Sequence, residues 1–124
     1  MNEFIVFIIG SLGYSVIEML WRGYTHWTMG IAGGICFLLI YNVNLRISSG
    51  LFIKCLLSSL CITAVEFVFG VFFNMILRLD IWDYSALPLN LFGQICLLYS
   101  VMWFFLSIPL IKLCDILKVT LEEV

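Results

Sequence analysis

Four long and continuously apolar stretches constrain the fold of this chain more than any other feature. They cover residues 4–21, 27–45, 55–77 and 87–111. Each is close to or above the ~20 residues that an α-helix needs to cross about 30 Å of hydrocarbon. Because the stretches lack the alternation of apolar and polar residues that is typical of membrane β-barrels, we expect helices. The sequence therefore predicts an all-α fold, a bundle of four transmembrane helices.

The amino-acid composition also indicates a protein that folds in a lipid bilayer. Hydrophobic residues make up 64% and charged residues 11% of the 124 residues, against roughly 45–50% and about 25% in soluble domains. A small soluble domain has too little interior to bury this much apolar surface. The connections at residues 22–26, 46–54 and 78–86 leave no room for a soluble domain. We therefore expect a single integral membrane domain over residues 1–124, in a lipid bilayer, with the first stretch retained as a span.

The charged residues exclude one class of partner and predict an orientation. Lys and Arg number 6 and Asp and Glu number 8, so there is no basic surface to bind nucleic acid. One side of the predicted membrane carries four basic residues and the other carries two: Arg46, Lys54, Lys112 and Lys118 against Arg22 and Arg78. The positive-inside rule then places both termini in the cytoplasm, as in a multi-pass protein of the cell inner (plasma) membrane.

Two parts of the chain are similar to each other. Residues 33–39 (GGICFLL) align with residues 93–99 (GQICLLY), and residues 16–18 align with residues 64–66. Each unit would contain two helices. The pattern therefore predicts two similar helical hairpins, related by an axis along the membrane normal.

Glu66 lies in the middle of the third stretch. A charged side chain at this depth costs on the order of 3 kcal/mol, so the carboxyl group should face the bundle interior and not lipid. Asn74 lies on the same helical stripe. One interpretation is a site that binds a proton, a cation or a polar substrate group. The structural alternative is a hydrogen bond from Glu66 to Tyr14, Asn90 or Gln94 that holds helices together.

A similar polar stripe follows the first helix. Glu18 can reach Arg22 four residues later, and Tyr14 lies on the same face. The pairing would neutralise Glu18, which is the structural alternative to a binding role. Taken together, these residues predict one polar site between the hairpins, formed by Tyr14, Glu18, Glu66, Asn74, Asn90 and Gln94.

A second group of residues is predicted at the outer membrane interface: Arg22, His26, Trp27, Trp82 and Asp83. Tryptophan is enriched at this depth. We expect His26 to bond Asp83 or a lipid phosphate, and Asp83, Ser85 and Pro88 to begin the fourth helix. His26 is the only histidine, and no two candidate ligands have zinc-type spacing, so we predict neither a metal site nor a cofactor.

Three blocks of the sequence carry a resemblance to a known family. They are HWTMG at 26–30, GGICFLL at 33–39 and WDYSALPLNLFGQIC at 82–96. On these blocks the chain resembles the ABC-transporter type IV (CmpB-like) family of small polytopic membrane proteins. The resemblance implies a transport permease, although the chain contains no nucleotide-binding motif of its own.

Three hypotheses for function follow. The first is a transporter or permease-like component in which protonation of Glu66 is the coupling step, working as a homo-oligomer or within a larger membrane complex. The second is a non-catalytic membrane subunit that binds a larger complex. The third is a lipid-acting membrane enzyme that uses His26 and Asp83. Because the sequence places no nucleophile beside His26, the residues favour a protein that is not an enzyme.

Overall fold

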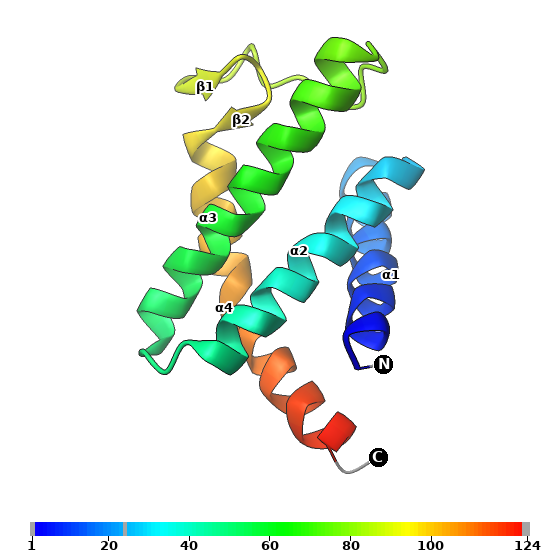
Figure 1. Cartoon of the computed structure of the whole chain (residues 1–124). Helices are drawn as coiled ribbons and strands as arrows, with labels where there is room; N and C mark the ends of the chain where they lie inside the picture. Colours follow the sequence, from blue (N-terminus) through cyan, green and yellow to red (C-terminus); the bar gives the residue numbers. More distant parts are fainter. Residues whose placement is uncertain (1, 24, 123–124) are drawn as a thin grey trace.

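A computed structural model describes residues 2–23 and 25–122. The elements are α1 (Asn2–Arg22), α2 (Trp27–Arg46), α3 (Leu51–Phe69) with its π-helical continuation η1 (Gly70–Ile76), β1 (Asn90–Leu91), β2 (Ile95–Cys96) and α4 (Leu97–Glu122). Within the described residues, 4 helices are long and apolar enough to span a membrane. The predicted all-α membrane fold with four spanning helices is therefore confirmed (Figure 1).

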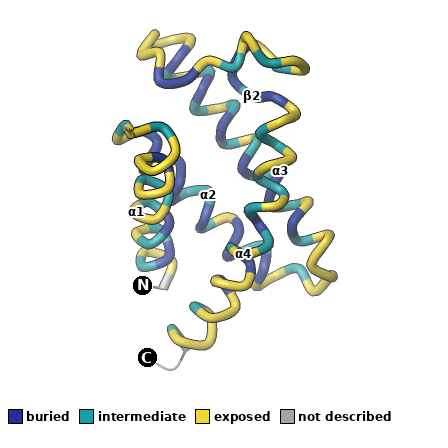
Figure 2. Tube along the Cα trace, turned by 180° about the vertical axis from the view of Figure 1, so that it is seen from behind, coloured by how far each residue is buried: buried dark blue, intermediate teal, exposed yellow. Residues whose placement is uncertain are grey.

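The helices pack as two hairpins. α1 packs along α2, and α3 packs along α4, while α2 also contacts α3 and α4 and so joins the two pairs. Both ends of the chain lie at one end of the molecule, and the loop that carries β1 and β2 lies at the other (Figure 1). Apart from its partner α2, α1 stays largely separate from the other helices, including α4 (Figure 2).

Large apolar side chains point away from the helix contacts, as expected in lipid. Leu12, Leu60 and Phe105 are 64%, 58% and 61% exposed, and Figure 2 shows long exposed faces on α1 and α4. α2 is the most buried of the spans. The exposed apolar surface is the surface that acyl chains would cover in a bilayer.

Glycines allow the close contact between α1 and α2. A Cβ atom at Gly33 would lie 2.4 Å from the Tyr14 Cβ, and one at Gly10 would lie 2.4 Å from the Phe37 Cβ. Such small residues let helix backbones approach closely in membranes. The glycine-rich face of α2 is therefore used inside the bundle.

α3 begins at Leu51, four residues before the predicted start of the 55–77 stretch. Lys54 lies in its first turn and donates to Asn44 Oδ1 at 2.8 Å, and Asn44 Nδ2 donates to Asp115 Oδ1 at 2.7 Å. Because these polar partners lie at the end of α2 and on α4, the charged side chain does not stop the helix.

The prediction that the fourth helix covers 87–111 is wrong at its start, because α4 begins at Leu97. The preceding segment turns back on itself instead. Leu89, Phe92 and Gly93 have positive φ values of 55°, 54° and 71°, which end a right-handed helix. The chain then forms a short antiparallel ladder in which Asn90 pairs with Cys96. Apolar composition alone did not distinguish this hairpin from a helix.

The two similar stretches of sequence therefore adopt different conformations. Residues 33–39 lie inside α2, whereas residues 93–96 form the hairpin turn and β2. The two similar glutamates do occupy comparable positions, since Glu18 and Glu66 are each buried on the first helix of a hairpin.

Candidate functional site

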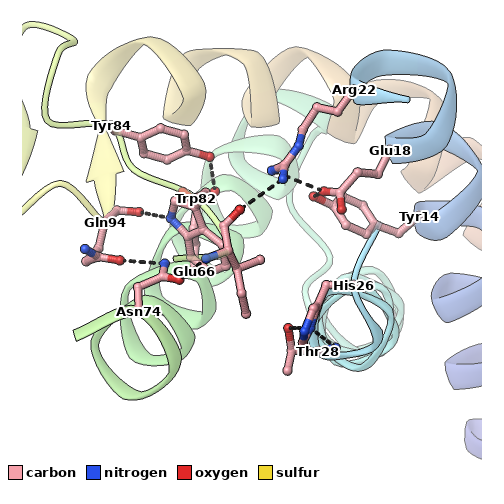
Figure 3. Close-up of polar contacts among 11 residues, drawn as sticks. Tyr14, Glu18, Arg22, His26, Thr28, Glu66, Asn74, Trp82, Tyr84 and Gln94 are labelled. Atoms are coloured by element: carbon pink, nitrogen blue, oxygen red, sulfur yellow. Dashed lines mark hydrogen bonds and ion pairs between the residues drawn. The ribbon is translucent and has the colours of Figure 1, made fainter. Parts of the chain in front are cut away.

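Glu66 is the one acidic residue of the third span. Its side chain is 9% exposed, and its Oε2 accepts a hydrogen bond from the Tyr84 hydroxyl at 3.0 Å (Figure 3). The other carboxyl oxygen, Oε1, and the Trp103 indole N–H are both buried. Trp103 lies close enough to act on the Glu66 carboxyl group, but among the described residues neither atom makes a hydrogen bond of normal geometry. A buried polar atom without a partner costs about 1–3 kcal/mol, so this arrangement points to something other than stability.

Tyr84 lies in the loop before α4, and two contacts hold it in place. Its ring stacks on Tyr99 with centroids 4.7 Å apart, and its backbone N–H donates to the Gly93 carbonyl at 2.7 Å. Burial and the neighbouring Glu66 carboxyl raise the pKa of Tyr84 above its ordinary value. The hydroxyl therefore remains protonated and can serve Glu66 only as a donor or a neutral neighbour.

Glu18 has a similar arrangement with one difference in charge. The Tyr14 hydroxyl donates to Glu18 Oε2 at 2.8 Å, and Arg22 Nη1 lies 3.9 Å from the same oxygen. Glu18 is 4% exposed, and its Oε1 has no partner among the described residues. Arg22 also donates to the Ile81 carbonyl at 3.0 Å, which connects α1 to the loop of the other hairpin (Figure 3).

A cavity of about 210 Å³ lies between the two helix pairs and reaches Glu66. Its wall is almost wholly apolar and includes Tyr14, Trp82 and Trp103. A second hollow of about 720 Å³ lies between α1 and α4 and reaches Glu18 and Arg22. The two share lining residues: Tyr14, Ile17, Met29, Trp103 and Leu106. The two hollows therefore adjoin each other, and each has a carboxyl group in its wall.

Asn74 and Gln94 lie together, but their hydrogen bonds hold the loop before α4 and do not reach Glu66. Asn74 Nδ2 donates to Gln94 Oε1 at 2.9 Å, and Asn74 Oδ1 accepts the Ile81 N–H at 2.7 Å. The Trp82 indole N–H donates to the Gln94 carbonyl at 3.0 Å. A Cβ atom at Gly70 would lie 2.5 Å from Gln94 Oε1, so a glycine is needed for the loop to pack here. Neither amide lines the cavity beside Glu66.

Asn90 lies farther out and also organises the loop. Its Nδ2 donates to the Leu87 carbonyl at 2.8 Å, and its Oδ1 accepts the Gly93 N–H at 3.0 Å. The structure does not place Asn90 beside Glu66, because the residues from 87 to 96 form a hairpin and not a helical turn. The expected bonds from Glu66 to Tyr14, Asn90 or Gln94 are replaced by the bond from Tyr84.

The predicted pair of His26 and Asp83 does not form. His26 Nδ1 accepts the Thr28 backbone N–H at 3.3 Å and so caps the start of α2. Asp83 Oδ1 accepts the Ser85 N–H at 2.9 Å, and this bond holds the pKa of Asp83 below its ordinary value. Each residue thus bonds the backbone two positions along the chain, and Asp83 and Ser85 do not begin a helix. Figure 3 shows His26 apart from the Glu66 cluster.

The two interface tryptophans have different surroundings. Trp27 is 64% exposed and contacts Phe73 edge-on at 5.9 Å, whereas Trp82 is buried. Over residues 2–23 and 25–122, no three His, Cys, Asp or Glu side chains come together in a way that could hold a metal ion.

Sequence reasoning missed two residues of the site, Tyr84 and Trp103. Both appear in the sequence only as aromatic residues near or within a span. Tyr84 is 18 positions from Glu66 along the chain, and no spacing rule connects a loop residue to a helix at that separation. The one available signal was the polar composition around Tyr84. It indicated that residues 82–96 matter, but not that Tyr84 contacts Glu66.

Comparison with protein families matches residues 3–123 to the family described as Putative ABC-transporter type IV. The chain belongs to this family. The match covers the whole membrane-spanning region, so this ABC-transporter-type-IV protein is a small multi-pass membrane protein. Neither the curated proteins nor the solved structures yield a match.

Proposed function

We propose that this protein is a transporter or permease-like membrane component in which Glu66 binds a proton or a cationic group. The observation that supports this proposal is a buried carboxyl group on the wall of an internal cavity, whose Oε1 makes no hydrogen bond of normal geometry among the described residues. Ionisable groups inside membrane spans are costly, and they typically mark ion, proton or substrate pathways. The family description agrees with such a role.

The charges around Glu66 suit a single positive ligand. Glu18 already has Arg22 at 3.9 Å, whereas no ion pair of Glu66 is recorded among the described residues. The other groups that face or neighbour Glu66 are formally neutral: Tyr14 on α1, Cys36 on α2, Tyr84 on the loop, and Tyr99 and Trp103 on α4. An ionised Glu66 would therefore be balanced by a bound cation, and a protonated Glu66 would release that cation.

A non-catalytic subunit is the second candidate. Asn74 and Gln94 favour it, since their buried hydrogen bonds hold the loop on η1. Under this alternative, Glu66→Gln would lower stability or assembly without affecting solute movement, and the protein would co-purify with a larger complex. The loop network does not explain why a carboxyl group is buried on the cavity wall, and for this reason we place transport first.

Proton movement in proteoliposomes tests the proposal. The purified protein is reconstituted with the pH-sensitive dye pyranine inside, and a gradient of Na⁺, K⁺, choline or tetraethylammonium is imposed in separate trials. We expect protons to move against at least one of these cations. Glu66→Gln should abolish the movement because an amide cannot exchange a proton, and Glu66→Asp should retain a reduced rate.

Glu3→Gln is the matched control, because it removes an exposed carboxyl group from the end of α1. This variant should transport like the original protein. Unchanged, pH-sensitive movement in Glu66→Gln would remove Glu66 from the mechanism. No proton movement with any of the four cations would favour the subunit alternative.

A further inference from the structure

The internal space is open on one side, between α1 and α4. The larger hollow has its walls on these two helices, which do not pack against each other as α1 does against α2. Its rim includes exposed apolar side chains from both: Ile17 and Leu20 on α1, and Met102 and Phe105 on α4, with exposed fractions of 45%, 84%, 39% and 61%. In a bilayer this rim would face acyl chains, so the hollow opens to lipid and not only to water.

The two hollows together extend along the membrane normal. The larger hollow extends from Arg22 and Tyr99, near the outer helix ends, to Pro109 within α4. The smaller cavity continues past Glu66 towards Leu113. A molecule dissolved in the hydrocarbon could therefore reach Glu66 sideways, without crossing the loop that covers the end of the bundle.

The lining combines apolar surface, aromatic faces and an uncompensated carboxyl group. Tyr14, Trp82 and Trp103 line the space near Glu66, and Tyr84 and Tyr99 line its outer part. Aromatic faces attract cations, and more strongly where water is excluded. Glu66 lines the smaller cavity of about 210 Å³, and the adjoining larger hollow of about 720 Å³ falls within the roughly 300–1,000 Å³ that is usual for small-molecule sites.

We propose that the site takes a lipophilic organic cation that enters from the bilayer between α1 and α4 and is held at Glu66. This inference rests on the proposed function, since it names the substrate class of the same carboxyl group. A hydrated inorganic ion does not fit an apolar entrance, because it would lose its water without replacement ligands. A lipophilic anion fits the entrance but is repelled by Glu66. A large cation with apolar substituents satisfies both the walls and the charge.

Binding of two ions of equal shape and opposite charge tests the charge requirement. Tetraphenylphosphonium and tetraphenylborate are titrated separately into the detergent-purified full chain by isothermal titration calorimetry, with empty micelles subtracted. We expect saturable binding of tetraphenylphosphonium and no saturable binding of tetraphenylborate. Equal binding of both ions, or of neither, would overturn the inference and indicate a nonspecific apolar hollow or one filled by lipid.

Variants at the carboxyl groups locate the ligand. Glu66→Gln should weaken tetraphenylphosphonium binding by about tenfold or more, because one unscreened charge contact is lost. Glu66→Asp should restore part of the affinity. Glu18→Gln should have a smaller effect because Arg22 already neutralises Glu18. Circular dichroism and size-exclusion profiles must match those of the original protein, and unchanged affinity in a folded Glu66→Gln would refute the assignment.

A second variant tests the cavity without altering any charge. Gly13 lines the cavity, and a Cβ atom added there meets nothing within 4 Å. Gly13→Leu should therefore fold and reduce tetraphenylphosphonium affinity by occupying part of the space. Ala64→Leu is the control, because Ala64 is exposed on α3 and does not line either cavity. Equal affinities in the two variants would place the ligand elsewhere.

The binding and transport experiments can fail separately. Tetraphenylphosphonium binding without any proton movement in proteoliposomes would support the site and refute transport. Proton movement that depends on Glu66 but is driven only by small cations, without tetraphenylphosphonium binding, would support transport and refute the lipophilic substrate class.

Discussion

At the scale of single residues, the site consists of two tyrosine–carboxyl pairs of unequal charge. Tyr14 donates to Glu18 at 2.8 Å, and Tyr84 donates to Glu66 at 3.0 Å. Arg22 lies 3.9 Å from Glu18 of the first pair, whereas no ion pair of Glu66 is found among the described residues. The sequence indicated Glu18 with Arg22 because four residues form one helical turn. It did not indicate Tyr84, because that contact depends on how a loop returns to the bundle.

Tyr84→Phe tests the hydrogen bond to Glu66. The variant removes the Tyr84 hydroxyl that donates to Glu66 Oε2, while the buried Oε1 already lacks a hydrogen bond of normal geometry among the described residues. We expect a loss of about 1–3 kcal/mol of stability, measured by thermal unfolding in detergent. Tyr99→Phe is the control, because it keeps the ring stack and no hydrogen bond of its hydroxyl is recorded among the described residues. Equal losses in the two variants would contradict the proposed importance of the bond.

At the scale of elements, packing between α1 and α2 differs from packing between α1 and α4. Glycines on α2 bring α1 close, and the α1–α4 side remains open. Which helix packs against these glycines follows from the tertiary structure and not from the sequence pattern. The prediction that a helix begins within residues 87–96 was wrong, although these residues are apolar enough to be part of a span. Their turn is specified instead by the Asn90 side chain and by positive φ angles.

Gly33→Leu tests the close contact between α1 and α2. A Cβ atom at Gly33 would lie 2.4 Å from the Tyr14 Cβ, so the helices must separate and Tyr14 must shift away from Glu18. Overpacking of this kind costs about 1–3 kcal/mol or somewhat more, to be measured by unfolding in detergent. Gly13→Leu adds the same side chain where there is room. A Gly33→Leu protein as stable as Gly13→Leu would contradict this packing.

At the scale of the whole molecule, the chain runs up and down through four spans with both termini at one end (Figure 1). The fold leaves a lateral opening between α1 and α4; Glu18 lines this hollow, and Glu66 lines the smaller cavity that adjoins it. The four-span topology follows from the apolar stretches, whereas the opening does not. Homo-oligomer formation and assembly with a larger complex remain proposals, and a partner that covered the α1–α4 opening would change access to Glu66.

The proposed orientation gives a prediction at this scale. Four basic residues lie on the side of the termini and two on the side of the loops at 22–26 and 78–86, so both termini should be cytoplasmic. Green fluorescent protein fused at the C-terminus should fluoresce, and alkaline phosphatase fused there should be inactive. A phosphatase fusion placed after Arg78 should be active. The reverse pattern would invert the orientation of the Glu66 pathway.

The sequence alone was enough to predict a lipid-embedded protein built from four spanning helices, with Glu66 inside the third. These properties depend on the summed transfer free energy of about 20 consecutive residues, which is a local quantity. The three-dimensional packing was needed to show that Tyr84 bonds Glu66 and that α1 and α4 leave a space between them. It was also needed to show that three amide side chains stabilise the loop: Asn74, Asn90 and Gln94. Those outcomes depend on contacts between residues far apart in the chain, and local composition and periodicity carry no information about such contacts.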